Sequence, residues 1–370
     1  MYLSNLKIFN FKNCSSADLT FSEKINCFVG FNGAGKTNLL DAIYYLSFCK
    51  SYFNPSDTQN IRHGEDFFSV HGVYYRNGSP GEKVSVVQKR NQKKQFSLNE
   101  KVYDRLADHI GLFPLVMISP YDRDMINEGS ETRRKYIDSV ISQWDKTYLN
   151  HLLSYNKALF QRNRMLKDFA ERGRFDPELL DAWNHQLTES GNYIHQARKE
   201  FLERFLPLFN DYYRQISGSQ EEVSMLYESQ LSEKPLNTLL AESIERDRAV
   251  RYTTCGIHKD DLVMLINGYP VKKFGSQGQQ KSYVIAIRLA QFDLIRQIKG
   301  YNPLLLLDDI FDKLDERRVK YLIHLVGENN FGQVFITDTQ HERINRLFEQ
   351  VDISHKIYEV NNGVVSPVNG

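Results

Sequence analysis

The chain has 370 residues, of which 41% are hydrophobic and 25% are charged, and its formal net charge is +1 at pH 7. That length fits two or three domains, or one core domain with an insertion, and the composition is that of an ordinary soluble globular protein. No apolar run is long enough to span a membrane, and the N-terminus lacks the pattern of a secretory signal. The four cysteines lack the spacings of a zinc site or a disulfide framework. We therefore expect a cytoplasmic protein.

The N-terminal part of the chain has the pattern of strands interrupted by one helix. Short strand-like runs, LKIFNF and INCFV, lie within residues 1–29, and strand character returns over residues 67–98. Between them, the stretch TNLLDAIYYLSF is typical of a helix. The dipeptide Asn77-Gly78 predicts a hairpin within the second group of strands.

A glycine-rich loop joins the first strands to that helix. Residues Gly30–Thr37 read GFNGAGKT, which fits the pattern G-x-x-x-x-G-K-[ST] in the required setting of strand, loop and helix. The glycines allow backbone N–H groups to surround phosphate oxygens, and the helix N-terminus favours their negative charge. We predict that Lys36 reaches the β- and γ-phosphates of a nucleotide and that the Thr37 hydroxyl binds Mg²⁺. The alternative, a glycine-rich turn that binds nothing, is disfavoured by this setting.

Residues 81–101 form a basic window, although the whole chain is nearly neutral. The window contains Lys83, Lys89, Arg90, Lys93, Lys94 and Lys101 against the two acidic residues Glu82 and Glu100. A local patch of this kind fits a nucleic-acid backbone, and it fits a solvated hairpin equally well. The sequence leaves these two interpretations open.

Residues 133–216 have helical periodicity, because apolar side chains recur at intervals of three and four. Gly173 and Pro177 interrupt the pattern once, which predicts an antiparallel pair of helices. A helix of about 35 residues would extend roughly 50 Å, so the segment is long enough to project as an arm. At its start, Arg133, Arg134 and Lys135 are expected to lie on a solvated helix face.

Strand character returns in DLVMLINGYPVKKF, where Asn267-Gly268 predicts a hairpin. A helix from Ser276, an apolar strand at 304–307, a helix near 315–326 and a strand at 333–337 follow. Apolar strands separated by helices are typical of a buried parallel sheet. The simplest architecture is one α/β domain built from both ends of the chain, with a helical insertion. The segment GIHKDD, residues 256–261, fits either the start of the hairpin or a contact with nucleotide or DNA.

Two carboxylates follow the apolar strand LLLL at residues 304–307. Such a strand delivers Asp308 and Asp309 to the edge of the sheet where ligands of open α/β sheets bind. We predict that Asp308 holds Mg²⁺, directly or through water, and that Asp309 polarises the attacking water. An acidic loop with no function is the alternative, and the phosphate loop upstream disfavours it.

The helix start FGSQGQQKS combines a cap with an unexplained glycine. Ser276 and Gln279 fit the capping box S-x-x-Q, in which both side chains satisfy backbone N–H groups. Gly278 lowers helix stability at its position and is not required by the cap. A glycine there allows close approach of another group, and a helix N-terminus favours an anion.

These motifs follow one another in the order that ABC-type ATPases share: the phosphate loop, the insertion, the S-x-G-Q helix start and the apolar strand with Asp-Asp. Within that class the chain most resembles the RecF family of SMC-like DNA-repair ATPases. The resemblance extends along the chain in blocks of the same order and spacing: NFKN (10–13), GFNGAGKTNLLDAIYYLSFCKSY (30–52), SPYDRDMINEGSETRRKYID (119–138), GIHKDDLVMLING (256–268), SQGQQKS (276–282) and LLLLDDIFDKLD (304–315).

The resemblance implies an α/β fold: an ABC-type P-loop ATPase head with a mixed β-sheet and an inserted helical arm. Residues 1–130 would form the N-terminal lobe of the head, with the Walker A loop, and residues 131–250 the arm. Residues 251–370 would form the C-terminal lobe, with the signature, the Walker B strand and a D-loop at Leu314-Asp315.

The family further implies an ATP-dependent DNA-binding clamp in DNA replication and recombinational repair, with ATP and Mg²⁺ as cofactors and weak, slow ATP hydrolysis. It would act at gaps and single-strand/double-strand junctions with RecO- and RecR-like mediators. ATP bound by one copy would be capped by the signature of a second copy, so that ATP drives formation of a homodimer. Closure would bring basic surfaces, including Lys89, Arg90, Lys93 and Lys94, over the DNA backbone.

The site residues expected on these grounds fall into three groups. They are Lys36, Asp308 and Asp309 for catalysis; Gly30, Phe31, Asn32, Gly33, Ala34, Gly35, Lys36, Thr37, Ser276, Gly278 and Gln279 for nucleotide binding; and Thr37 and Asp308 for the metal.

The chain departs from the ABC-type pattern at several positions. Asp309 stands where a glutamate is typical, as in the RecF pattern, and Thr337-Asp338-Thr339 occupies the switch position instead of a histidine. Asp312 replaces the serine with which the RecF D-loop usually begins. The block SPYDRD contains no glutamine, so we assign no metal ligand there. These departures bear on the rate of hydrolysis more than on nucleotide binding.

Two other functions share the nucleotide motifs. One is the ATPase subunit of a membrane transporter, which the absence of the switch histidine, the two-helix insertion and the NFKN start disfavour. The other is an ATPase of a phage-defence assembly with an attached nuclease, for which we expect no room after the sheet.

Overall fold

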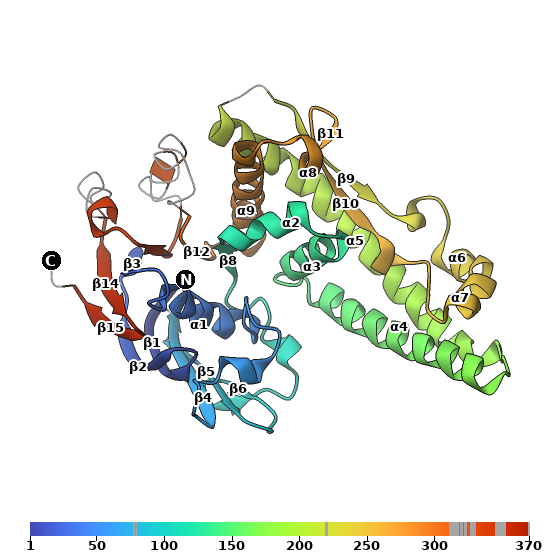
Figure 1. The fold of residues 1–370 in the computed structure, drawn as a ribbon, viewed down its shortest axis with the longest axis horizontal. Helices are drawn as coiled ribbons and strands as arrows, with labels where there is room; N and C mark the ends of the chain where they lie inside the picture. Colours follow the sequence, from blue (N-terminus) through green and yellow to red (C-terminus); the bar gives the residue numbers. More distant parts are fainter. Residues whose placement is uncertain are drawn as a thin grey trace. The chain divides into compact units, whose positions relative to one another are not determined.

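The computed structural model describes residues 1–76, 78, 80–218, 221–310, 318, 321, 324–325, 331–344 and 353–368. The chain divides into two compact units (Figure 1). The first unit contains Met1–Asp122 and Ile287–Gly370, and the second contains Arg123–Ala286. Helix α9, Gln277–Lys299, crosses this boundary in the sequence. Within the described ranges, no helix has the length and apolar character needed to cross a bilayer.

A largely parallel six-stranded sheet forms part of the first unit. Its strand order is β15-β14-β3-β13-β12-β8, and β15 pairs antiparallel with β14. The strands are β3 Ile25–Val29, β8 Leu115–Ile118, β12 Leu304–Leu307, β13 Val334–Asp338, β14 His355–Asn361 and β15 Val364–Pro367. The four strands β3, β8, β12 and β13 are buried along their whole length, as unbroken apolar runs require. Both ends of the chain contribute to this sheet, which confirms the predicted α/β architecture.

A second, antiparallel sheet in the first unit has the order β2-β1-β4-β5-β6-β7. Its strands are β1 Tyr2–Phe11, β2 Cys14–Thr20, β4 Phe67–Tyr75, β5 Glu82–Lys89, β6 Gln95–Leu98 and β7 Lys101–Val102. Helix α1, Lys36–Phe48, contacts strands of both sheets and is buried over most of its length. Side chains from both sheets and from α1 therefore form one hydrophobic core.

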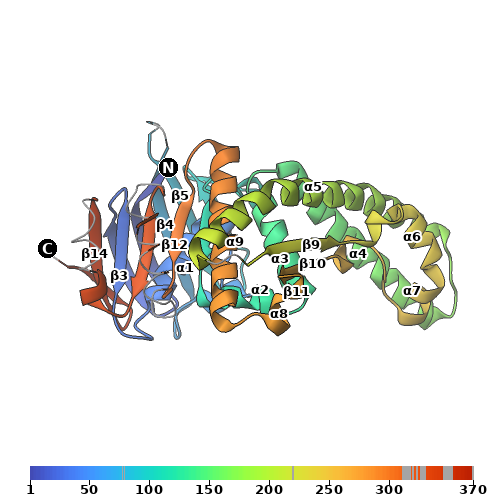
Figure 2. The ribbon, with the colours of Figure 1, turned by 90° about the horizontal axis from the view of Figure 1, so that it is seen from above.

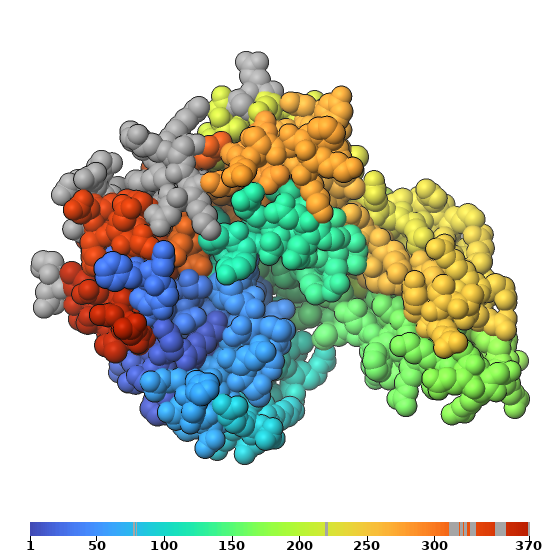
Figure 3. Space-filling view, in the orientation of Figure 1, coloured from blue at the N-terminus to red at the C-terminus, as the bar shows by residue number. Residues whose placement is uncertain are grey.

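The second unit is mainly helical, with a small antiparallel sheet of order β11-β10-β9. Its helices are α2 Asp124–Asn127, α3 Ser130–Ile141, α4 Lys146–Arg172, α5 Glu178–Ser217, α6 Leu236–Glu242, α7 Ile244–Val250 and α8 Val271–Phe274, and its strands are β9 Val223–Glu228, β10 Asp261–Ile266 and β11 Tyr269–Pro270. Helices α4 and α5 lie side by side (Figure 2). The short helices α6 and α7 pack against this pair, and they are the yellow surface beside the green of α4 in Figure 3.

The ends of α4 show why the helix pair forms where the sequence predicts it. Asp145 caps its first turn by accepting a hydrogen bond from the Tyr148 N–H at 2.8 Å. Gly173 follows its last residue with φ of 64°, the left-handed conformation that glycine adopts readily at a helix end. The chain then reverses into α5, whose 40 residues extend about 60 Å.

Other expected elements have mixed outcomes. The hairpin at Asn267-Gly268 is confirmed, and both residues have positive φ, at 48° and 78°. Strands β2, β7, β8, β9, β14 and β15 were not predicted. Two further expectations lie outside the described residues: Asp312 and the D-loop at Leu314-Asp315. The same holds for the expected helix near 315–326, of which only a few single positions are described. The predicted lobe boundaries at 130 and 250 stay a prediction. The two compact units are defined by which residues lie close together in space, and the chain passes from one unit to the other after residues 122 and 286.

A fully buried ion pair fixes the helices of the second unit to one another. The Arg162 guanidinium on α4 donates to the Asp247 carboxylate on α7 at 2.7 Å, and neither side chain is exposed. Arg162 also donates to Asn184 on α5 at 2.8 Å. The second Asp247 oxygen accepts from the backbone N–H and hydroxyl of Thr254 at 2.8 and 2.6 Å. Removing one charge would therefore leave the other buried and uncompensated.

We expect Asp247→Ala to lower the free energy of unfolding by about 3–5 kcal/mol, because Arg162 would keep its charge without a buried partner. Urea denaturation followed by circular dichroism measures this loss. The matched control is Glu242→Ala, which removes an exposed ion pair to Lys234 in the same unit and should cost less than about 1 kcal/mol. Equal losses in the two variants would contradict the stabilising role of the buried pair.

Candidate nucleotide-binding site

The phosphate loop, Gly30–Thr37, connects β3 to α1 in the first unit. A Cβ at Gly30 would lie 2.2 Å from the backbone oxygen of Val360, so only glycine fits there. Gly35 has φ of 113° and is the N-cap of α1, where no side chain caps the helix. Because the first N–H groups of a helix have no intrahelical partner, this uncapped start is a ready site for an anion.

Two residues in turns between other strands support the loop, Asn13 between β1 and β2 and Gly363 between β14 and β15. The Asn13 amide donates to the Ala34 carbonyl at 3.1 Å and accepts from the Asn38 amide at 2.7 Å. The Gly363 N–H donates to the same Ala34 carbonyl at 2.8 Å. The sequence contained Asn13 in the NFKN block and Gly363 in an Asn-Gly turn, but neither pattern indicates a contact with the phosphate loop.

Lys36 points back across the loop that precedes it. Its ammonium group donates to the carbonyl oxygens of Gly30 at 2.9 Å and Phe31 at 3.2 Å, and the side chain is 3% exposed. Oδ1 of Asp309 lies 3.9 Å from this ammonium group. The positive charge therefore lies inside the cradle that the loop forms, where a phosphate would compensate it.

Asp308 directly follows β12 and accepts hydrogen bonds from two threonines. Its Oδ1 accepts from the Thr37 hydroxyl at 2.8 Å and from the Thr337 hydroxyl at 2.9 Å. Burial raises the pKa of Asp308 to about 6, although these two hydrogen bonds oppose the rise. Thr337 lies near the end of β13. In the sequence it was placed at the switch position, but its hydrogen bond to Asp308 was not predicted; its position at the end of a strand of the same parallel sheet was the available signal.

Asp309 has an unusual backbone conformation. Its φ is 43°, in the left-handed region that few residues other than glycine adopt, although aspartate tolerates it better than most. Its backbone N–H donates to the Thr337 hydroxyl at 2.8 Å, which helps to hold this conformation. Its Oδ1 is buried and makes no hydrogen bond. A buried carboxylate oxygen without a donor, beside Lys36, fits a site that binds a further polar group.

The donor set fits Mg²⁺ bound together with a nucleotide. The Thr37 hydroxyl and Asp308 Oδ1 lie 2.8 Å apart, close to the roughly 2.9 Å between two adjacent ligands of an octahedral Mg²⁺. Among the described residues there is no cluster of three or more His, Cys, Asp or Glu side chains that could hold a metal alone. Phosphate oxygens and water would therefore complete the coordination, as is usual for Mg²⁺.

The signature residues lie in the second unit, at the start of α9. The predicted capping box is present: the Ser276 N–H donates to Gln279 Oε1 at 2.6 Å, and the Gln279 N–H donates to the Ser276 hydroxyl at 3.2 Å. The Gln279 amide also donates to Glu221 at 2.6 Å. Ser276 is exposed, and Gly278 lies in the first turn. The structure thus joins Gly30–Thr37 with Asp308 and Asp309 in the first unit, and Ser276 with Gly278 and Gln279 in the second.

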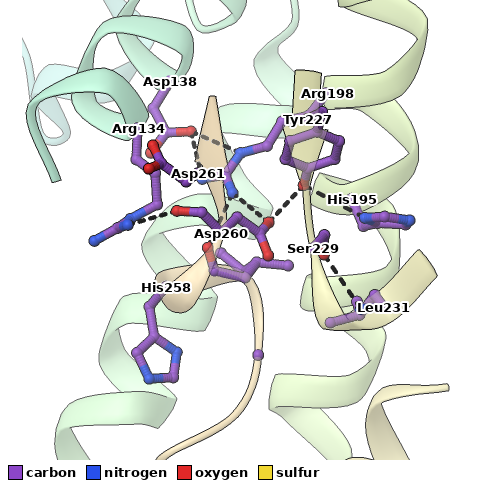
Figure 4. Close-up of polar contacts among 12 residues, drawn as sticks. Arg134, Asp138, His195, Arg198, Tyr227, Ser229, Leu231, His258, Asp260 and Asp261 are labelled. Carbon is purple, nitrogen blue, oxygen red and sulfur yellow. Dashed lines mark hydrogen bonds and ion pairs between the residues drawn. The ribbon is translucent and has the colours of Figure 1, made fainter. Parts of the chain in front are cut away.

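The blocks RRKYID and GIHKDD meet in a buried polar network within the second unit (Figure 4). Arg198 on α5, 1% exposed, donates to Asp138 on α3 and to Asp260 before β10, each at 2.9 Å. The Tyr227 hydroxyl also donates to Asp260, at 2.5 Å. Burial lowers the pKa of His258 to about 4, so this imidazole is neutral. Of the two interpretations of GIHKDD, these internal contacts favour the structural one.

The expectation of a solvated face at residues 133–135 is wrong for two of its three members. Arg133 donates to both oxygens of Asp261, at 2.7 and 2.9 Å. Arg134 donates to the backbone oxygen of Asp260 at 2.6 Å. Only Lys135 is solvated, with 75% of its side chain exposed. The periodicity placed all three on one turn of α3 but did not show that β10 packs beside it.

The basic window is also only partly available to a ligand. Lys94 is 10% exposed and donates to Asp57 at 2.7 Å, to the Cys49 carbonyl at 2.6 Å and to the Tyr45 hydroxyl at 3.0 Å. It therefore belongs to the interior of the first unit, which corrects its assignment to a DNA-facing surface. Lys89 and Lys93 are exposed.

Comparison with known proteins was made once this geometry was established. The RecF/RecN/SMC N terminal domain family matches residues 2–366. The DNA replication and repair protein RecF of Flavobacterium johnsoniae is 52% identical over 97% of this chain and 100% of that protein. RecF of Phocaeicola vulgatus is 48% identical over 99% of this chain and 98% of that protein.

Solved structures give the same grouping. The recombination mediator protein RecF with ATP, of the RecFOR pathway, aligns with a TM-score of 0.90 and 30% identity over 100% of this chain and 98% of that chain. An Smc head domain from Pyrococcus furiosus aligns with a TM-score of 0.58 and 16% identity over 99% of this chain and 96% of that chain, which shows a shared fold.

We expect Lys36→Ala to weaken ATP binding by roughly a hundredfold or more, because it removes a buried charge that would contact phosphate oxygens. Isothermal titration calorimetry with Mg²⁺-ATP measures the affinity. Lys135→Ala, at an exposed lysine, is the matched control and should bind ATP as the unaltered protein does. Unchanged affinity in a folded Lys36→Ala variant would refute the assignment of the phosphate loop.

The raised pKa of Asp308 predicts a pH-dependent stability of the nucleotide-free protein. The folded state holds the Asp308 proton up to about pH 6, whereas the unfolded chain releases it near the usual pKa of 3.8. Binding of this proton therefore stabilises the folded state at low pH, and the stabilisation is lost as the pH rises from about 4 to about 6. Asp308→Asn carries no charge, so we expect it to be more stable than the unaltered protein above about pH 7, by on the order of 2 kcal/mol.

Urea denaturation between about pH 5 and pH 8 tests this prediction, and the advantage of Asp308→Asn should shrink toward the acid end. Asp18→Asn is the control. A hydrogen bond from Asn5 lowers the pKa of this exposed carboxylate, so removing its negative charge should not stabilise the fold. An advantage of Asp308→Asn that does not change with pH would contradict the assignment.

Proposed function

Since the chain belongs to the RecF family, we propose that it is an ATP-dependent DNA-binding clamp of DNA replication and recombinational repair. The observation that carries this proposal is the convergence of Lys36, Thr37, Asp308 and Asp309 at one edge of the parallel sheet. Family membership, expected from the sequence blocks and confirmed by the relatives, favours this function over a transporter subunit or a phage-defence ATPase.

The chemistry assigned to each residue follows from its position. The backbone of Gly30–Thr37 and the charge of Lys36 would bind the phosphates of ATP, and Thr37 with Asp308 would hold Mg²⁺. The metal would neutralise charge that develops on the phosphates. Asp309 would orient and polarise the attacking water, since its Oδ1 is buried without a donor. A carboxylate shorter than the usual glutamate by one methylene fits weak and slow hydrolysis.

The helix start at Ser276 would act on ATP bound by a second copy of the chain. Ser276 is exposed although it caps α9, and Gly278 in the first turn leaves the backbone accessible. An exposed helix N-terminus favours an anion, and a γ-phosphate offers one. ATP would thus join two copies, and hydrolysis would release them.

The substrate and partners are assigned from the relatives. The solved relative is a recombination mediator protein in the RecFOR pathway, and we extend this role to the present chain. The DNA would be gapped, with single-strand/double-strand junctions, and the protein partners would be RecO- and RecR-like mediators. Contacts with phosphates make such binding independent of sequence and sensitive to salt.

We expect Ser276→Arg to abolish ATP-dependent dimerisation while leaving ATP binding by the monomer unchanged, because the bulky side chain would fill the position of the partner's phosphate. Ser276→Asp should have the same effect, since aspartate preserves the helix cap but repels a phosphate. Sedimentation velocity with and without Mg²⁺-ATP, repeated with gapped DNA, measures the assembly.

Ser366→Arg, at an exposed position on β15, is the control and should dimerise normally. If both Ser276 variants still dimerise with ATP, the proposed role of the signature helix is wrong. If the unaltered protein binds ATP but neither dimerises nor binds gapped DNA, the clamp function is wrong.

A further inference from the structure

The antiparallel sheet of the first unit has one face packed on the core and one face open to solvent. Burial alternates along β1 and β4, with Leu6, Val70 and Phe68 on the inner face. The residues between them lie on the opposite face, because side chains alternate along a strand. We call this opposite face, formed by β2, β1, β4, β5 and β6, the open sheet face.

Two aromatic pairs lie on the open sheet face, one toward each end of β4. Phe9 and Phe67 have ring centroids 5.5 Å apart, and Phe9 is 44% exposed. Tyr2 and Tyr75 are stacked, with centroids 5.4 Å apart and ring planes inclined by 16°, and Tyr75 is 37% exposed. Exposed aromatic rings gathered on one face of a sheet indicate a surface that binds a ligand.

The Tyr75 ring is held in a fixed orientation. Tyr2 stacks on it, and Gly81 lies so close that a Cβ there would come within 3.0 Å of the ring. A ring restrained in this way loses little conformational entropy when a flat group stacks on it.

Small and basic side chains surround these rings. The strand register places four serines on the open sheet face: Ser16, Ser69, Ser85 and Ser97. Lys7, Lys83 and Lys89 lie on the same face and are exposed; Lys7 pairs with Asp18 at 2.9 Å and Lys83 pairs with Glu100 at 3.9 Å. Because the serines are short, the aromatic rings and the lysines extend furthest from the sheet.

We propose that the open sheet face binds single-stranded DNA by stacking its bases on Phe9, Phe67, Tyr2 and Tyr75, with Lys7, Lys83 and Lys89 contacting the phosphates. This inference rests on the proposed function, which requires contact with DNA. Aromatic rings on a sheet beside basic side chains are the usual means of binding unpaired bases. Duplex DNA is a poor fit, because its bases are already stacked on one another. A protein partner fits less well, because lysine and serine are depleted at protein interfaces.

The separation of the two pairs sets the length of DNA that the face accommodates. Phe67 and Tyr75 are eight residues apart on β4, which corresponds to about 27 Å along an extended strand. That span matches a single-stranded site of about four nucleotides or more. The open sheet face would thus contact the single-stranded side of a gap.

The test compares variants that remove the more exposed ring of each pair. We expect Phe9→Ala and Tyr75→Ala each to weaken binding of an oligo(dT) strand roughly tenfold, as loss of one stacked base requires. Fluorescence anisotropy measures the affinity. Phe9→Trp and Tyr75→Phe, which keep an aromatic ring, should bind as the unaltered protein does. Photocrosslinking of DNA substituted with 5-bromodeoxyuridine, mapped by mass spectrometry, should label Phe9 or Tyr75 directly.

Controls separate this inference from the proposed function. Phe160→Ala removes an aromatic ring that is 65% exposed on α4 of the second unit, and it should leave oligo(dT) binding unchanged. Mg²⁺-ATP affinity should be the same in every variant. If the unaltered protein binds DNA and the alanine variants bind oligo(dT) equally well, the open sheet face is not the site, although the clamp function stands. If the unaltered protein binds no DNA, both are wrong.

Discussion

The site depends above all on the Asp308 carboxylate, whose Oδ1 accepts hydrogen bonds from Thr37 and Thr337. These partners are 271 and 29 residues away in the sequence. They meet because β3, β13 and β12 are parallel neighbours, and the carboxyl ends of parallel strands share one edge of the sheet. The Thr337 hydroxyl also accepts a hydrogen bond from the backbone N–H of Asp309, so one hydroxyl holds the Asp308 carboxylate and the Asp309 backbone. A shift of β13 would therefore disturb the phosphate loop and both acidic residues together.

The second unit is organised by buried arginines rather than by a sheet. Arg162 and Arg198 each reach carboxylates from other elements, and both are almost fully buried. Burying such charges is costly unless every partner is in place, so the networks specify one arrangement of the helices. Two of the blocks shared with the RecF family, RRKYID and GIHKDD, contribute to this arrangement. Their resemblance to the family thus reflects how the unit is built.

The two sheets of the first unit have different surfaces, and the difference follows from their strand patterns. Unbroken apolar strands are buried on both faces, so the parallel sheet is accessible to ligands at its carboxyl edge, where the residues proposed to bind nucleotide lie. Strands with alternating apolar and polar residues leave one face in water, so the antiparallel sheet exposes aromatic and basic side chains on that face. One compact unit thereby has the edge proposed to bind nucleotide and a separate face with aromatic and basic side chains.

The sequence by itself determined the phosphate loop, the strand that ends at Asp308, the helix pair around Gly173 and the capping box at Ser276. Each of these is local, set by residue spacing and by the conformations that glycine, serine and asparagine favour. Only the tertiary structure decided the roles of Asn13, Thr337, Arg133 and Lys94. Their partners lie far away in the sequence, and whether a polar side chain meets solvent or a buried carboxylate depends on which strand or helix packs beside it.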